Sequence, residues 1–370
     1  MIKHLIKYLI FFLLVPSTLF SQLFQQDYST RIDSLPKEKT MFIHLLGASF
    51  FNNNEFFNAY QPGYTLIGGM LQPKLIYVIN SKLKLSGGLH LREYYGDDGT
   101  MLVHPLFSID YKVNDAFNIL MGSFEGGQNH RLPETIFAFE NHFSELVENG
   151  ILININKSFL MSEIWLDWEK FIKPADTFRE EFMVGIVNRI KLFTSNENLR
   201  LEIPVIILAH HAGGQINNNN QAIESVYNIS EGFKIFRPTV SGSRLVSPAT
   251  EVLIHHSAGD YATGSGTAIH INAGIGIENF ELNAGYFIAK NFMSFRGLPL
   301  YHSFIENQPS GYTLGGTNEI LNFKAGFRAK INRTSFLFLR FEGYYNLSNK
   351  KFDYTYGLHM QVNEIIRFKK

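Results

Sequence analysis

The stretch from Leu321 to Phe368 constrains the fold most, because it alternates between apolar and polar residues over three successive segments, 321–331, 335–345 and 352–362. In the first, the odd positions are apolar and the even ones are Asn, Lys, Gly, Arg and Lys. Residues spaced by two share one face of a β-strand. Segments of about ten residues with charges on the second face are typical of an outer-membrane barrel. A soluble β-sandwich also carries charges on one face, so other features must separate the two.

The N-terminal segment 1–21 has the features of a secretory signal peptide. Lys3 and Lys7 precede a short apolar core, 8–15, which ends at Pro16. This core is too short to span a membrane as a helix. We expect cleavage after Ser21 and a periplasmic lead-in over residues 22–39. No run of eighteen apolar residues occurs in the rest of the chain, so the exported chain is expected to be either soluble or a barrel.

Composition narrows the choice further. Aromatic residues make up 14% of the 370 residues, including 34 Phe and 17 Tyr, a high share that fits the aromatic girdles of a membrane barrel. The formal net charge of +0 gives no electrostatic reason to expect nucleic acid as a partner. The absence of cysteine excludes a lipoprotein anchor, disulfides, thiolate catalysis and cysteine-based metal sites.

Sixteen candidate strands follow from Met41 onward, with fourteen as an alternative count. We predict an all-β, closed antiparallel transmembrane β-barrel over residues 40–370. The predicted strands include the first at Met41–Phe51, the sixth at Ile151–Ile155 and the eleventh at Glu251–His256. Short turns tend to alternate with longer connections, as expected of a barrel with short periplasmic turns and long external loops. The two longest connections are residues 125–150 and 294–317.

Aromatic residues with lipid-facing parity lie near the predicted strand ends. Strand ends lie at the membrane interface, where side chains with one apolar and one polar end are expected. They are Tyr95, Trp168, Tyr345 and Tyr354 near the outer rim and Tyr77 and Tyr111 near the inner rim.

With these features the chain resembles Gram-negative outer-membrane β-barrel proteins over residues 41–368, including the aromatic Phe368 close to the C-terminus. The resemblance implies the cell outer membrane as the location. It implies outer-membrane lipid and the barrel insertion machinery as partners, and a possible homo-oligomer.

The second face of the predicted strands carries many charges. We interpret them as the lining of a water-filled passage that selects solutes, because a barrel of about sixteen strands is too wide for side chains alone to close. The alternative is a set of ion pairs that stabilises a filled interior. The candidate solute-contacting residues are Lys84, His90, Arg92, Glu163, Asp167, Arg189, Arg200, Lys324, Arg328, Arg340 and Glu342.

The third external loop has a possible role in that passage. Residues 133–147 have a Pro near the start and apolar residues at helical spacing, which predicts a short amphipathic helix. The loop resembles, in order and length, the loop that classical porins fold into the lumen. Its three acidic residues would then form a constriction: Glu134, Glu140 and Glu145 are expected to face Arg200, Arg328 or Arg340. The alternative is an external lid or a partner-binding helix.

Two histidine pairs raise the possibility of an enzyme. His210-His211 and His255-His256 both end predicted outward-running strands, where they could converge with His90, His104 or His130. Such histidines can bind a metal or act as the general base for a serine nucleophile. No G-x-S-x-G or H-E-x-x-H signature is present, so a structural role is favoured and we assign neither catalytic residues nor a metal.

The sequence therefore favours a porin-like, non-enzymatic channel that passes small polar solutes and needs no cofactor. One alternative is a scaffold or receptor that uses loops 52–62, 125–150 and 294–317 as a docking surface. The other is a hydrolase of lipid or surface polymer, with its site at the outer rim.

Overall fold

The structure is a computed structural model that describes residues 38–58, 60–126, 130–192, 199–214, 216, 221–237, 247–277, 279–304 and 316–367. The predicted signal peptide, nearly all of the lead-in and Phe368 lie outside the described residues. Within the described part of the chain, no helix is long and apolar enough to cross a membrane.

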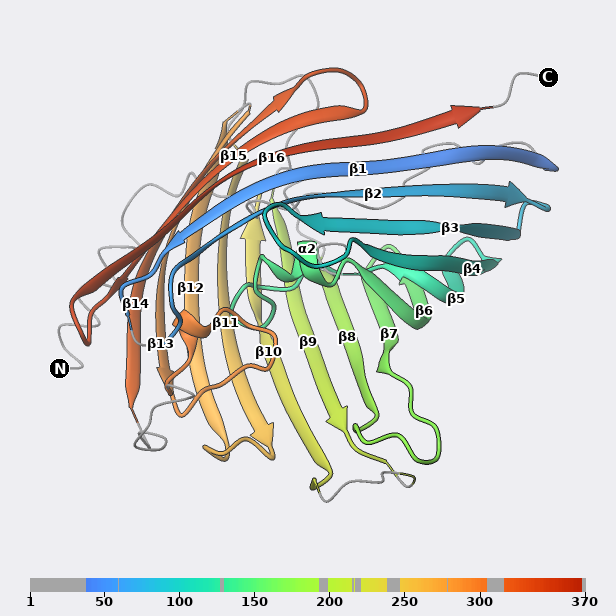
Figure 1. Cartoon of the computed structure of the whole chain (residues 1–370). Helices are drawn as coiled ribbons and strands as arrows, with labels where there is room; N and C mark the ends of the chain where they lie inside the picture. The colour runs from blue at the N-terminus through green and yellow to red at the C-terminus, as the bar shows by residue number, and fades with distance from the viewer. Residues whose placement is uncertain are drawn as a thin grey trace.

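Sixteen antiparallel strands form one closed barrel (Figure 1), which confirms the predicted fold class and strand count. Each strand pairs with the next along the chain. The last pairs with the first, with Val362 opposite Gly47. The strands are β1 Thr40–Glu55, β2 Tyr64–Val78, β3 Leu83–Tyr94, β4 Leu102–Asn114, β5 Phe117–Glu125, β6 Val147–Asn156, β7 Leu160–Lys170, β8 Glu181–Leu192, β9 Arg200–Ala212, β10 Glu224–Phe236, β11 Ser247–Gly259, β12 Gly266–Ile277, β13 Phe280–Lys290, β14 Thr317–Lys330, β15 Ser335–Asn346 and β16 Lys351–Arg367.

The alternation in the sequence becomes the two faces of the barrel wall. On β14, Leu321 and Phe323 point outward and are each 46% exposed, whereas Asn322 between them points inward and is 3% exposed. Closure also leaves every strand with a hydrogen-bonded neighbour on both sides. A barrel therefore satisfies its backbone without water in the hydrocarbon layer.

The two ends of the barrel can be told apart by their connections. Thr40 and Arg367 lie at the same end, together with the short turns at residues 79–82, 115–116, 157–159 and 331–334. This is the periplasmic end of an outer-membrane barrel, and the long connections between 125 and 147 and between 290 and 317 belong to the outer end.

Several predicted boundaries were too short. β1 extends to Glu55, so Asn52, Asn53 and Asn54 are buried in a strand and do not belong to a free loop. β6 begins at Val147 and β11 spans Ser247–Gly259. The reason is the same in each case: ladder pairing with a neighbouring strand continues past the end of the local apolar pattern.

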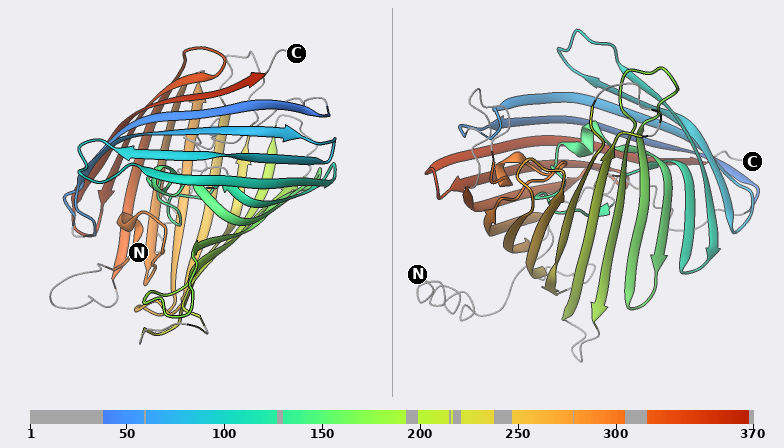
Figure 2. Two further views of the ribbon diagram at one scale, coloured as in Figure 1. Left: turned by 45° about the vertical axis from the view of Figure 1, so that its right-hand side comes forward. Right: turned by 90° about the horizontal axis from the view of Figure 1, so that it is seen from below.

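Two outer connections fold into the barrel rather than away from it. Figure 2 shows the segment that contains α2 (Asn141–Ser144) and the segment with the short 3-10 helix η2 (Pro299–Tyr301) inside the ring of strands. They also hold each other, because the amide of Ala138 donates to the carbonyl of Arg296 (2.6 Å) and the amide of Leu298 donates to the carbonyl of Glu134 (3.0 Å). The predicted helix in this loop is present but only four residues long, since most of the loop runs as turns that fit the inner wall.

Candidate functional site

The outer half of the barrel interior is an apolar core built on the two inserted segments. Ile136, Phe292 and Tyr301 are almost fully buried and belong to one cluster with Trp165 and Phe287 of the wall. Apolar packing of this kind excludes water. The wide water-filled passage expected from the strand count is therefore obstructed in this half of the barrel.

Below this core, acidic Glu134 of the inserted loop meets charged residues of β14 and β15. Its carboxylate pairs with the ammonium of Lys324 and lies 3.1 Å from Arg340 Nη2, while Tyr344 Oη donates to it at 3.0 Å. Glu342 completes the network at 2.5 Å from Arg340 and 3.1 Å from Lys324. The side chains of Arg340 and Glu342 are only 3% and 1% exposed, so this is a buried, compensated charge cluster that anchors the loop.

The other two acidic residues of the loop have partners that the sequence did not predict. Glu140 accepts hydrogen bonds from Asn52 Nδ2 (2.9 Å), Asn54 Nδ2 (2.5 Å) and the hydroxyl of Tyr64. Burial raises the pKa of Glu140, although the two amides act in the opposite direction. Glu145 pairs with Arg296 at 2.6 Å. Of the three, only Glu134 reaches a predicted partner, Arg340; within the described residues none pairs with Arg200 or Arg328.

The remaining lumen residues are divided between the wall and the rim. Arg92 donates to the carbonyls of Phe143 and Ser144 and so fixes the end of α2. Lys84 pairs with Asp110 at 2.5 Å, and Asp167 accepts from the backbone amide of Asn149 at 2.7 Å. Exposed Arg200 and Arg328 lie near the periplasmic end of their strands, and buried His90 lies opposite His104 on β4. Arg189 belongs to the wall of a cavity described below.

His130 of the inserted loop is buried between two carboxylates. Its ring stacks on Trp165 at 3.7 Å between centroids, with Nε2 at 3.0 Å from Glu148 and Nδ1 at 3.1 Å from Glu163. Burial lowers its pKa, but Glu148 and then Glu163 outweigh burial and raise the pKa to about 10. The ring is therefore a buried imidazolium that ties the loop to β6 and β7.

This site predicts a pH dependence of stability. The folded-state pKa of His130 lies above the unfolded value of about 6.5. Its contribution is therefore fully present below pH 6.5 and is lost as pH rises toward 10. In urea unfolding of detergent-refolded protein, we expect the wild-type midpoint to fall more between pH 7 and 10 than that of His130→Gln. Parallel pH profiles for the two proteins would contradict this assignment.

The two histidine pairs considered for a rim site have separate surroundings in the structure. His255 points inward and is fully buried, with Nδ1 2.6 Å from Ser230 Oγ. His210 also points inward and lies 3.5 Å from Glu169. Ligand atoms of Glu169, Glu181 and His210 lie within 4.8 Å of one another. The two carboxylates already pair with Arg296 and Lys170, however, and we assign no metal to them.

A serine–histidine pair instead lies on the outside of the barrel. Ser225 of β10 and His211 of β9 are cross-strand partners at the outer end of these strands. Ser225 Oγ is 2.8 Å from His211 Nδ1, and His211 Nε2 is 2.7 Å from the carbonyl oxygen of Gly213. His211 is among the candidates that the sequence suggests and Ser225 is not, although both have lipid-facing parity. The two residues pair because of the register between β9 and β10, which a Gly/Asn-rich connection joins. The periodicity of the sequence does not determine that register.

Aromatic side chains surround this pair on the outer surface. The ring of His211 lies 5.0 Å from that of Phe182, which stacks on Trp168 at 5.4 Å. Trp168 is 37% exposed and Tyr227, on the same face of β10 as Ser225, is 41% exposed. Such aromatic groups are typical of the boundary between hydrocarbon and headgroups. The pair therefore faces the outer leaflet at the level of the lipid headgroups.

Comparison with known proteins now gives the family. Residues 32–370 match the family model described as lipid A 3'-O-deacylase-type. The chain belongs to this family. No curated protein matches the chain in sequence.

Solved structures that are similar to this family member are outer-membrane barrels. Pseudomonas aeruginosa OccK2 (OpdF) in complex with glucuronate has a TM-score of 0.55 and 9% identity, covering 90% of this chain and 100% of that one. OmpT of Vibrio cholerae with loop L8 deleted has a TM-score of 0.52 and 10% identity (89% and 100% covered). OprD of P. aeruginosa has a TM-score of 0.51 and 8% identity, covering 89% of this chain and 96% of that one. The resemblance to Gram-negative outer-membrane barrels and the outer-membrane location are thus confirmed; at these identities the likeness concerns the fold.

Proposed function

We propose that this protein hydrolyses an ester-linked acyl chain of an acylated lipid in the outer leaflet, with the reaction at the outer rim of the barrel. The observation that carries the proposal is the hydrogen-bonded pair Ser225 and His211 on the lipid-facing surface. Membership of the lipid A 3'-O-deacylase-type family supports the same substrate class. The apolar core inside the barrel argues against a wide pore as the main function.

The hydrogen bonds of His211 suit it to act as a general base. The carbonyl of Gly213 can only accept, so Nε2 carries the ring proton and donates it. Nδ1 is then the unprotonated nitrogen, and it accepts the hydrogen bond of the Ser225 hydroxyl. A backbone carbonyl thus fixes the tautomer, as the third group does in other serine–histidine sites.

The reaction follows from this arrangement. Ser225 Oγ attacks the ester carbonyl carbon while its proton moves to His211 Nδ1. The carbon–oxygen bond to the sugar or glycerol then breaks, and the alcohol leaves with that proton. Water, deprotonated by the same nitrogen, releases the fatty acid and restores the serine hydroxyl.

Mass spectrometry of lipid products tests the proposal. Purified protein in detergent micelles is incubated with lipopolysaccharide or with a diacyl phospholipid. We expect release of one fatty acid per lipid and a lipid lighter by that acyl group. Intact lipids after incubation with folded protein would contradict the proposed function.

A second candidate is a narrow passage for small polar solutes, favoured by the charged residues that surround a cavity inside the barrel. Planar-bilayer recording separates it from a wide porin. We expect no large conductance steps, because segments 130–146 and 291–304 fill the outer half of the interior. A variant with 291–304 replaced by a Gly-Ser linker is the positive control and should conduct more. Large, stable steps from the wild type would favour the porin-like function.

A further inference from the structure

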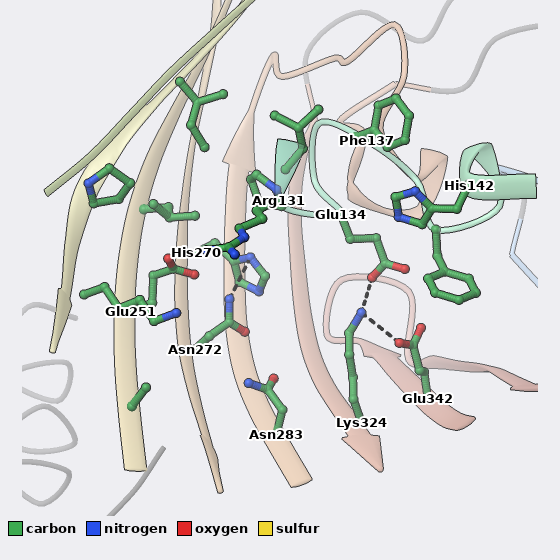
Figure 3. Close-up of a pocket in the computed structure, with 18 of the residues that line it drawn as sticks. Arg131, Glu134, Phe137, His142, Glu251, His270, Asn272, Asn283, Lys324 and Glu342 are labelled. Atoms are coloured by element: carbon green, nitrogen blue, oxygen red, sulfur yellow. Dashed lines mark hydrogen bonds and ion pairs between the residues drawn. The ribbon is translucent and has the colours of Figure 1, made fainter. Parts of the chain in front are cut away.

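The inserted segments leave a cavity on their periplasmic side. Its volume is about 150 Å³, far more than one water molecule needs. Figure 3 shows Arg131 and Glu134 of the inserted loop on one side and Glu251, Asn272 and Lys324 of the wall on the others. Most of its wall residues belong to the periplasmic halves of their strands, as Lys234 does on β10.

The cavity wall carries more positive than negative charge. Five cationic residues and three glutamates line it, a difference of 5 − 3 = +2. Lys324, Arg340, Glu134 and Glu342 compensate one another in the anchoring cluster. The other charged lining residues are the cations Arg131, Arg189 and Lys234 and the carboxylate Glu251.

Arg189 is the most important contributor to this excess of positive charge. It is 4% exposed, and its Nη2 donates to the carbonyl of Arg131 at 2.7 Å, while its Nε has no hydrogen-bond partner among the described residues. A buried N–H without an acceptor destabilises the protein, and the effect is larger when the donor is charged, as a guanidinium is. Two other carboxylates, Glu163 and Glu202, belong to neighbouring strand positions but do not line the cavity.

We propose that this cavity binds a small hydroxylated carboxylate from the periplasm. The carboxylate of the ligand accepts hydrogen bonds from Arg189 and Arg131, which match the planar geometry of a carboxylate. The amides of Asn272 and Asn283 also line the cavity and would hydrogen-bond the hydroxyl groups of the ligand. The site is separate from the Ser225–His211 pair, which lies on the outer surface of the same wall.

Calorimetric titration of gluconate into the detergent-solubilised protein tests this site. We expect saturable binding of gluconate and at least ten times weaker binding of glucitol, its uncharged analogue. Arg189→Gln should weaken gluconate binding at least tenfold, and so should Lys234→Met, a second variant in case the first does not fold. Arg200→Gln, at the exposed periplasmic rim, is the matched control and should bind as the wild type does.

The outcomes are distinct from those of the hydrolase assay. Ser225→Ala should retain gluconate binding, so a failure of the proposed hydrolysis leaves this inference intact. No binding to folded wild type, equal binding of glucitol, or unchanged binding by both Arg189→Gln and Lys234→Met would overturn it.

Discussion

Replacement of Ser225 by alanine is expected to abolish ester hydrolysis, with a loss of at least about 100-fold in rate, because the nucleophile is removed. His211→Gln should reduce the rate by about 100-fold to 10,000-fold, since a positioned general base contributes that much. The side chains are partly exposed at a strand end, so neither change should unfold the barrel. The measurement is the initial rate of fatty-acid release from lipid micelles.

The chain offers a matched control for this experiment. Ser230 of β10 and His255 of β11 form a second cross-strand pair, at 2.6 Å, but both residues are completely buried in the interior. Ser230→Ala removes the same hydroxyl from a pair that no lipid can reach, and the rate should be unchanged. An active wild type together with an active Ser225→Ala variant would show that hydrolysis occurs at another site. An inactive wild type would reject the hydrolase function itself.

Replacement of Glu342 by glutamine is expected to have the largest effect on stability. The change keeps the shape of the side chain but leaves Arg340 and Lys324 to share one carboxylate of the cluster, that of Glu134. Breaking a buried ion pair on one side costs about 3 to 5 kcal/mol, because a buried charge loses its compensation. We expect the midpoint of urea unfolding to fall. We also expect the heat-induced shift in electrophoretic mobility to occur at a lower temperature than in the wild type.

Glu181→Gln is the control for that variant. Glu181 pairs with Lys170 at 2.7 Å at the outer rim, where the lysine side chain is 51% exposed. Pairs of this kind contribute at most about 1 kcal/mol, so the midpoint should shift little. Equal shifts for Glu342→Gln and Glu181→Gln would mean that the inner cluster does not anchor the inserted loop.

The sequence by itself determined the barrel and its two faces. Leu321 and Phe323 are exposed to lipid and Asn322 is buried because period two is a local property of a strand, readable without any partner. Strand number and the order of long and short connections followed for the same reason. The ends of strands were less accurate, as at Asn52–Asn54, since pairing with a neighbour decides where a strand stops.

Only the tertiary structure decided what the interior and the rim contain. Glu134 meets Arg340 across 206 positions of sequence, and Ser225 meets His211 through a register set by the whole sheet. The inserted segments are held by contacts with each other, such as that of Ala138 with Arg296, which no periodic pattern encodes. The local alternation of residues determines whether a side chain points to the lipid or to the interior. Long-range packing determines which other residues it contacts. For that reason the charged lumen inferred from the sequence has an apolar core in its outer half and a charged cavity on the periplasmic side of that core.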